Sequence, residues 1–357
     1  KHTGRTPLPC LVYLHGYSPD LNKLNWELIP RELLDYCDKF GYYLVAPFAR
    51  SNTDFQGVGE LDVIHVFQLL VRQYPIDPDR VFLFGYSMGA MGAFTVGAHF
   101  PDVWAGIVSI SGRADYYLWK DLDRNKVEPY KRHLIDMEFG ASMLGNYRNL
   151  PVLMYHGGAD TLIKLDQSRQ LHKKLKGLGA DVTLHELPGE DHWIMSSVML
   201  DDAVFKWMAR KKRNAWPAEV DFTTYTIKYR RSYWVTVLEM VRWGGPINVH
   251  AKFNRDKSML EVKTKNVASL RLNLSKELVG EAPKLTVRIN GKTYKVTKPG
   301  PATYEVEPTK RVGKLRKTPR LCGPVKAAYS RRFLLAIGSG GGTEEDAKRF
   351  RQAVIGA

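Results

Sequence analysis

The chain has 357 residues, of which 44% are hydrophobic and 25% are charged, a composition that excludes a disordered protein and fits a globular one. No apolar run approaches the ~18 residues of a membrane span, and Cys10, Cys37 and Cys322 are too scattered for a disulfide framework or a metal cluster. The net charge of +16 arises wholly after residue 215, since residues 1–215 hold 25 basic and 25 acidic side chains whereas residues 216–357 hold 28 and 12.

The first part of the chain alternates apolar runs with segments of helical periodicity. The apolar runs predict strands at Leu11–Leu14, Tyr43–Pro47, Val81–Phe84, Gly106–Ile110, Val152–Tyr155 and Val182–Leu187. Helices are predicted at Leu28–Phe40, Glu60–Gln73, Met88–His99, Asp166–Leu178 and Asp201–Lys212. Strands that are apolar throughout and separated by helices indicate a mostly parallel sheet with helices on both faces. Because the chain starts with Lys1 and its first strand begins by residue 10, we expect a mature or excised fragment.

The predicted strand Val81–Phe84 runs directly into Gly85-Tyr86-Ser87-Met88-Gly89, a Gly-x-Ser-x-Gly sequence followed by a predicted helix. A strand, this tight turn and a helix form the nucleophile elbow, in which the serine stands exposed at the edge of a sheet. Glycine on either side tolerates the strained backbone and lets the helix approach the strand. We therefore predict that Ser87 is a nucleophile. The alternative is a tight turn whose serine has no chemical role.

Residues 113–149 form a long insertion between two predicted strands and carry many aromatic and charged side chains, Trp119 among them. In a parallel α/β sheet, such an insertion lies over the carboxyl ends of the strands, where ligands bind. We predict a short lid or pocket wall here. The alternative is a surface excursion with a small core of its own.

A serine hydroxyl needs a base within hydrogen-bond reach, and that base needs an acid to hold its tautomer. His192 is the predicted base, because it follows the last strand of the sheet in a loop ahead of a helix. Asp160, in the loop after Val152–Tyr155, is the predicted acid; the alternatives are Asp115 as the acid, and a turn or N-cap role for Asp160. Three other histidines lie within or at the end of predicted strands and are weaker candidates for the base: His15, His156 and His185.

Two backbone N–H donors are needed to hold the oxyanion of a tetrahedral intermediate. Met88, directly after the nucleophile and at a helix N-terminus, is predicted to supply one, and Tyr17, after the turn at Gly16, the other. Four aromatic side chains are candidate walls of a substrate site, although each also fits core packing: Tyr86, Trp193, Phe55 and Trp119.

Helical periodicity stops after Trp216-Pro217, and alternating segments follow. Strands are predicted at Phe222–Lys228, Tyr233–Val241, Asn248–Asn254, Met259–Lys265, Ser269–Leu274, Lys284–Ile289, Thr293–Thr297 and Thr303–Glu307. Asn290-Gly291 predicts a two-residue hairpin turn, and Pro-Gly-Pro at 299–301 another turn. We predict a catalytic domain over residues 1–216 and a basic, antiparallel, sandwich-like accessory domain over residues 217–357 that ends in a helix at Thr343–Val354. The excess positive charge indicates either a surface for an acidic polymer or a solvated, lysine-rich face.

Four stretches within about the first 200 residues resemble the esterase and prolyl-oligopeptidase-like branch of the α/β-hydrolase superfamily, near feruloyl and acetyl esterases and polyhydroxyalkanoate depolymerase-like enzymes: Leu14–Tyr17, Asp77–Ala90, His156–Asp160 and Asp191–Trp193. Four later stretches resemble the β-rich extension of bacterial multidomain hydrolases of the same branch: Trp216–Val220, Tyr233–Val235, Gly323–Val325 and Phe333–Leu335. The resemblance implies a secreted or periplasmic enzyme, with plant-wall esters as one substrate class. The sequence shows no β-propeller of the kind that makes prolyl oligopeptidases selective for short peptides, which favours an ester substrate.

Together these features predict a serine carboxylic-ester hydrolase that acts through an acyl-enzyme, on feruloyl, acetyl or other short or aromatic esters, either as small molecules or linked to a polymer. We expect it to need no metal or organic cofactor and to have no specific nucleic-acid partner. One alternative is a serine peptidase with the same catalytic groups. The other is a non-catalytic polymer-binding protein.

Overall fold

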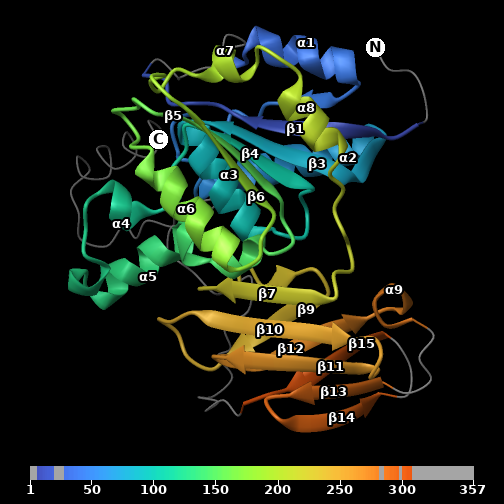
Figure 1. The fold of residues 1–357 in the computed structure, drawn as a ribbon. Coiled ribbons are helices and arrows are strands. Elements are labelled where there is room, and N and C mark those ends of the chain that lie inside the picture. The colour runs from blue at the N-terminus through green and yellow to red at the C-terminus, as the bar shows by residue number, and fades with distance from the viewer. Residues whose placement is uncertain (1–5, 20–27, 281–284, 297–299, 308–357) are drawn as a thin grey trace, which may run out of the picture. The chain divides into compact units, whose positions relative to one another are not determined.

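The computed structural model describes residues 6–19, 28–280, 285–296 and 300–307, and all of them fall in one compact unit. Figure 1 shows helices and strands alternating from blue to yellow-green, followed by strands in yellow and orange. Cys322 and the predicted helix Thr343–Val354 lie outside the described residues. The predicted domain boundary at residue 216 stays a prediction.

A six-stranded sheet in the order β2-β1-β3-β4-β5-β6 lies at the centre of the first part. Its strands are β1 (Leu8–Leu14), β2 (Tyr43–Val45), β3 (Ile76–Tyr86), β4 (Gly106–Ile110), β5 (Val152–Gly157) and β6 (Val182–Leu187). Every neighbouring pair is parallel, so the predicted parallel sheet is confirmed. Parallel strands end at the same edge, which brings the loops after β1, β3, β4, β5 and β6 together.

Helices cover both faces of this sheet, as Figure 1 shows. They are α1 (Arg31–Phe40), α2 (Val58–Gln73), α3 (Met88–His99), α6 (Asp166–Gly177), α7 (Met195–Val198) and α8 (Ala203–Ala209). Because alternate strand residues point to opposite faces, Val12 joins the core under α2, α3 and α6, whereas Tyr13 joins the core under α1, α7 and α8. This two-sided burial explains why the strands are apolar throughout.

The segment of residues 113–149 folds into short helices rather than an extended loop. They are α4 (Tyr116–Trp119), the 3₁₀ turn η2 (Arg124–Lys126), α5 (Pro129–Glu138), and the 3₁₀ turns η3 (Gly140–Ser142) and η4 (Leu144–Tyr147). Met137, Met143 and Tyr147 are buried in the core shared with α3, whereas Tyr130 is 64% exposed. The second half of the segment is therefore part of the core, and a lid role for the first half stays a prediction.

The β-rich part contains two sheets, in the orders β14-β13-β11-β10-β7 and β15-β12-β9-β8. The strands are β7 (Glu219–Thr224), β8 (Arg231–Ser232), β9 (Val235–Met240), β10 (Ile247–Asn254), β11 (Met259–Lys265), β12 (Val267–Leu274), β13 (Leu285–Ile289), β14 (Lys292–Val296) and β15 (Gly300–Glu305), with a short helix α9 (Lys276–Val279). Val249 and Val262 of the first sheet share one apolar core with Val237 and Leu270 of the second. The strand pairs are antiparallel except β11 and β13, which pair in parallel.

Several strand boundaries differ from the prediction, and three of them concern β7, β9 and β15. β7 ends at Thr224 rather than Lys228, because Tyr225 and Tyr229 turn inward and become buried. The strand predicted over Tyr233–Val241 begins only at Val235, as β9, because Tyr233 has a φ of 53° and breaks the extended chain between β8 and β9. β15 begins at Gly300, where a turn was predicted.

Two further expectations can be compared with the described residues. Cys10 and Cys37 are free, buried thiols, and burial raises the pKa of Cys37 to about 12. Among the helices that the structure describes, none combines the length and the apolar character needed to cross a bilayer.

Candidate active site

The turn between β3 and α3 holds Ser87 in a strained backbone conformation, with φ 53° and ψ −115°. The flanking glycines serve close approach rather than backbone freedom. A Cβ on Gly89 would lie 1.9 Å from the carbonyl oxygen of Leu14, and one on Gly85 would lie 2.2 Å from the carbonyl oxygen of Gly89. Strand and helix therefore pack too tightly for any side chain at these positions, as the elbow geometry requires.

His192 links the serine to a carboxylate. Its Nε2 lies 2.8 Å from Oγ of Ser87, and its Nδ1 lies 2.7 Å from Oδ2 of Asp160. His192 is only 4% exposed, and its backbone carbonyl accepts hydrogen bonds from the hydroxyls of Ser111 and Tyr86. The structure thus brings the three predicted residues together from the ends of β3, β5 and β6, in the geometry of a Ser-His-Asp triad.

The two carboxylate oxygens of Asp160 have different partners. Oδ1 accepts from the amides of Leu162 and Ile163 and shapes the turn after β5, while Oδ2 faces His192. Burial opposes ionisation, but hydrogen bonds from His156 and His192 hold the pKa of the Asp160 carboxyl below its ordinary value. The carboxylate is therefore ionised at neutral pH and can stabilise an imidazolium at His192.

The alternative acid and bases are occupied elsewhere. Asp115 is the N-cap of α4, accepts from the amides of Tyr117 and Leu118, and pairs with Lys174. Nε2 of His15 contacts the carbonyl oxygen of Phe48, and His185 stacks on Tyr155. His156 is fully buried, and its Nε2 lies 3.3 Å from Oδ2 of Asp160.

The predicted oxyanion donors flank the nucleophile. Met88 is the first residue of α3, so its amide is one of those that a helix leaves without an intrahelical acceptor. Gly16, which precedes Tyr17, packs against Tyr86, since a Cβ at Gly16 would lie 3.3 Å from the Tyr86 ring. The Tyr17 side chain is 65% exposed. The role of these amides stays a prediction.

The four candidate aromatic side chains have different surroundings. Trp193 is 67% exposed, and its ring centroid lies 5.4 Å from that of His192, so it borders the site. Tyr86 is half-buried and supports the His192 backbone through its hydroxyl. The prediction that Phe55 lines a substrate site is wrong, because Phe55 is fully buried against Gly92 and presents no surface to a ligand.

Trp119 lies on α4 with its ring between two cations, the guanidinium of Arg113 at 3.6 Å and the ammonium of Lys120 at 3.7 Å. Arg113 is 8% exposed and also approaches Asp54, 3.4 Å away. These contacts fix the Trp119 ring in place, and its part in substrate binding stays a prediction.

Sequence reasoning missed two supporting residues. Ser111 follows β4 and donates to the carbonyl of His192, but a serine after a strand carries no distinctive pattern. His156 was set aside as a strand residue, although its position four residues before Asp160 could have signalled a contact across the turn.

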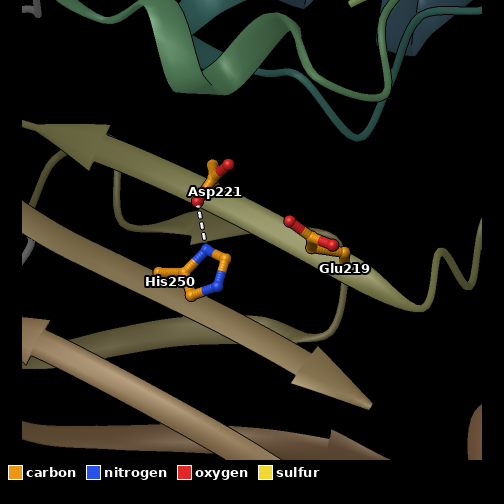
Figure 2. A group of neighbouring side chains, drawn as sticks. All are labelled: Glu219, Asp221 and His250. Carbon is orange, nitrogen blue, oxygen red and sulfur yellow. Dashed lines mark hydrogen bonds and ion pairs between the residues drawn. The ribbon is translucent and has the colours of Figure 1, made fainter. Parts of the chain in front are cut away.

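One cluster has the composition of a metal centre and lies outside the triad. Figure 2 shows Glu219 and Asp221 on β7 and His250 on β10, with one potential ligand atom from each within 4.8 Å of the others. The guanidinium of Arg148 pairs with both carboxylates, and Nζ of Lys252 lies 2.8 Å from Glu219. Cationic side chains thus already neutralise the acids, so the cluster is best described as an ion-pair network that joins the end of η4 to β7.

The family model of the prolyl oligopeptidase family (Peptidase_S9) matches residues 50–214 of this chain. A protein of Arthroderma benhamiae described as an uncharacterized secreted protein is 27% identical over 216 residues, which are 55% of this chain and 23% of that protein. The uncharacterized peptidase YtmA of Bacillus subtilis is 26% identical over 47% of this chain and 69% of its own length. Acyl-protein thioesterase 1 of Gibberella zeae is 25% identical over 40% of this chain and 53% of its own length.

Among solved structures, esterase PE8 matches with a TM-score of 0.41 and 23% identity, over 57% of this chain and 93% of that one. An acylaminoacyl peptidase of Pyrococcus horikoshii matches with a TM-score of 0.48 and 18% identity, over 60% of this chain and 39% of that one. The aligned part spans less than a quarter of the fungal secreted protein and about half of the thioesterase.

Proposed function

We propose that this α/β-hydrolase, whose residues 50–214 match the prolyl oligopeptidase family, is a serine hydrolase that cleaves carboxylic esters through an acyl-enzyme. The observation that carries the proposal is the continuous hydrogen-bonded chain from Ser87 through His192 to Asp160. The match to the family model and the peptidase and thioesterase names among the curated relatives support a serine hydrolase. Neither the family match nor these names distinguish an ester substrate from a peptide substrate, and the ester is our proposal.

In the proposed reaction, Oγ of Ser87 attacks the ester carbonyl while Nε2 of His192 takes its proton. Asp160 holds the Nδ1–H tautomer of His192 and stabilises the imidazolium that forms. The amides of Tyr17 and Met88 hold the developing oxyanion. His192 then returns its proton to the leaving alcohol, and water, activated by the same imidazole, hydrolyses the acyl-enzyme.

The exposed side chains around the triad favour a substrate with an apolar or aromatic group. Trp193 lies beside His192, Tyr17 lies beside the elbow, and Leu162, directly after the Asp160 turn, is 60% exposed. Such a rim offers flat apolar surface to an acyl group such as ferulate, or to a bulky alcohol. A peptide with a large hydrophobic residue would fit the same rim, so a serine peptidase is the second candidate.

Turnover of three substrates separates the two candidates: p-nitrophenyl acetate, methyl ferulate and a peptide anilide. We expect both esters to be hydrolysed faster than the anilide, and all hydrolysis to be lost in Ser87→Ala. Faster cleavage of the anilide would replace the esterase proposal with the peptidase. Equal rates in the wild type and in Ser87→Ala would remove the triad from the reaction.

The proposal includes export from the cytoplasm, to the medium or the periplasm. Its support is the similarity to the secreted fungal protein. Cell fractionation of the native host followed by immunoblotting tests it, and recovery of the protein only in the cytoplasmic fraction would contradict it.

We also propose that the β-rich part binds an acidic polymer. Lys263 and Lys265 of β11, each without an ion-pair partner among the described residues, line a groove of about 610 Å³ with Asn248 and His250 of β10. Two free ammonium groups on one face of a sheet attract a chain of carboxylates or sulfates.

Retention on immobilised polygalacturonate measures this binding. We expect the double variant Lys263→Glu/Lys265→Glu to elute at lower salt than the wild type and the matched control Lys173→Glu/Lys176→Glu, which makes the same charge change on α6. Co-elution of the two double variants would exclude the groove as the binding surface.

A further inference from the structure

His156, near the end of β5, is fully buried beside the triad acid. Its Nε2 lies 2.7 Å from the carbonyl oxygen of Ile163 and 3.3 Å from Oδ2 of Asp160. Its Nδ1 lies 2.7 Å from Oγ of Ser168, in the first turn of α6. Both ring nitrogens are therefore engaged, and one of them faces the carboxylate on which the triad depends.

These contacts determine where the proton of the neutral ring lies. A carbonyl oxygen has only lone pairs, so the 2.7 Å contact with Ile163 requires the proton on Nε2. Nδ1 is then an acceptor, and the hydroxyl of Ser168 donates to it. The Nε2–H of His156 consequently points at both the Ile163 carbonyl and the nearer oxygen of Asp160, with the longer contact to Asp160 acting mainly through electrostatics.

Two imidazoles thus converge on one oxygen of Asp160. Oδ2 lies 2.7 Å from Nδ1 of His192 and 3.3 Å from Nε2 of His156, while Oδ1 is held by two backbone amides. A carboxylate held by donors on both oxygens cannot rotate without losing several hydrogen bonds. It therefore presents a fixed lone pair to His192, which is the condition for holding a catalytic imidazole in one orientation.

We propose that His156 is a positioning residue of the active site. Held by Ser168, it orients Asp160 and sets how strongly that carboxylate binds the imidazolium of His192, so that the hydrogen-bonded chain runs Ser168–His156–Asp160–His192–Ser87. The inference rests on the proposed serine hydrolase function, because it concerns the protonated state that His192 reaches when Ser87 attacks.

The direction of the effect follows from charge. A donor at Oδ2 stabilises the anion of Asp160 and withdraws part of its charge from His192. Without His156, the carboxylate binds the imidazolium more strongly, so a higher pH is needed to free His192 as a base. The acid limb of the pH–rate profile therefore moves to higher pH, and looser orientation of Asp160 lowers the rate on the plateau.

Three other ionisable side chains lie near the hydrogen-bonded chain from Ser168 to Ser87: Tyr86, Asp191 and Glu186. All three are unchanged in the variants below. Tyr86 donates to the backbone carbonyl of His192. Glu186 is the strand partner of His156 on β6, and its charge is paired with Arg169. Because these groups stay in place, a shift of the acid limb between variants reports the contact between His156 and Asp160.

The test is the rate at which a fluorophosphonate modifies Ser87, measured from pH 5 to 9, because this reagent needs the triad but no knowledge of the natural substrate. His156→Leu should lower the plateau rate by about 10- to 100-fold and raise the midpoint of the acid limb by about half a pH unit. His156→Gln, whose amide N–H can reach the position of Nε2, should recover most of both. His185→Leu, on the neighbouring strand, is the matched control and should behave as wild type.

The outcomes separate this inference from the proposed function. If the wild type reacts but both His156 variants keep its rate and its acid limb, the positioning role is wrong and the serine hydrolase proposal stands. If the wild type does not react, the proposed function is wrong. Should His156→Leu not fold, Ser168→Ala decides, because it removes the hydroxyl that holds His156 and should lower the rate and move the acid limb to higher pH. A wild-type rate and limb in Ser168→Ala would then contradict the inference.

Discussion

The hydroxyl of Tyr229 helps to join the β-rich part to the first part of the chain, and its removal tests this junction. Tyr229, in the segment between β7 and β8, donates to the carboxylate of Glu60 on α2 and stacks on His99 of α3, with ring centroids 3.6 Å apart. Glu60 is 1% exposed and His99 2% exposed, and the two side chains pair with each other. The Tyr229→Phe variant keeps the ring and its stacking, and leaves a buried carboxylate with one donor fewer.

The expected loss follows mainly from the bond to Glu60, although the same hydroxyl also accepts from Nζ of Lys228 at 2.7 Å. A hydrogen bond to a charged group contributes about 1.5–3 kcal/mol to stability. Lys228, whose Nζ lies 3.8 Å from Glu60, can compensate in part, so we expect Tyr229→Phe to lose about 1–3 kcal/mol in the free energy of unfolding. The matched control is Tyr304→Phe, because the buried hydroxyl of Tyr304 has no hydrogen-bond partner among the described residues and its removal should cost nothing.

The effect should depend on pH in a defined direction. Burial alone would raise the pKa of Glu60, but His99, Lys228 and Tyr229 lower it below its ordinary value of 4.5. A lowered carboxyl pKa gives stability that is present above the unfolded value and lost as pH falls through the folded one. The difference in the free energy of unfolding between Tyr229→Phe and wild type should therefore be complete above about pH 4.5 and become smaller as the pH falls below that value.

The pair also limits stability on the alkaline side. Burial alone would lower the pKa of His99, but Glu60 raises it above its ordinary value of 6.5. A raised histidine pKa gives stability that is complete below the unfolded value and lost as pH rises through the folded one. Urea unfolding at pH 4 to 9 measures both limbs, and equal stability of Tyr229→Phe, Tyr304→Phe and wild type throughout would refute this account of the junction.

Three further predictions concern the elbow and its rim. Gly89→Ala should abolish soluble expression or lower the melting temperature severely, since the new Cβ would lie 1.9 Å from the Leu14 carbonyl oxygen. The control Gly177→Ala, whose Cβ would have no atom within 4 Å, should be neutral or slightly stabilising. Trp193→Ala should raise KM for methyl ferulate about 2- to 10-fold, corresponding to ~0.5–1.5 kcal/mol of aromatic contact, with an unchanged melting curve; an unchanged KM would remove Trp193 from the substrate site. Ser87→Ala should melt within about a degree of wild type while losing at least about 1,000-fold in turnover, and a large loss of stability would mean that the hydroxyl is structural.

The elbow and the triad were predictable because each depends on local constraints. Only glycine fits at residues 85 and 89 when a strand meets a helix this closely. The order of strands in the chain then assigns His192 and Asp160 to the loops that meet Ser87. The spacing of four residues between His156 and Asp160 is compatible with their contact across the turn, but the bond from Ser168 on the following helix has no signal in the sequence.

Non-local pairing accounts for most of the remaining differences. The parallel pairing of β11 with β13 has no sequence signal of its own. Val71 of α2 is apolar yet 40% exposed, while Glu60 of the same helix is buried because His99 and Tyr229 neutralise and bond it. A polar residue whose partners lie far along the chain is indistinguishable in sequence from a solvated one.

The most direct test of the central claim is the site of covalent modification by a fluorophosphonate, mapped by mass spectrometry of the digested protein. The account predicts one adduct, on the peptide containing Ser87, and its absence from a folded His192→Gln variant over the same reaction time. An unmodified wild-type protein, or an adduct on another residue, would contradict it.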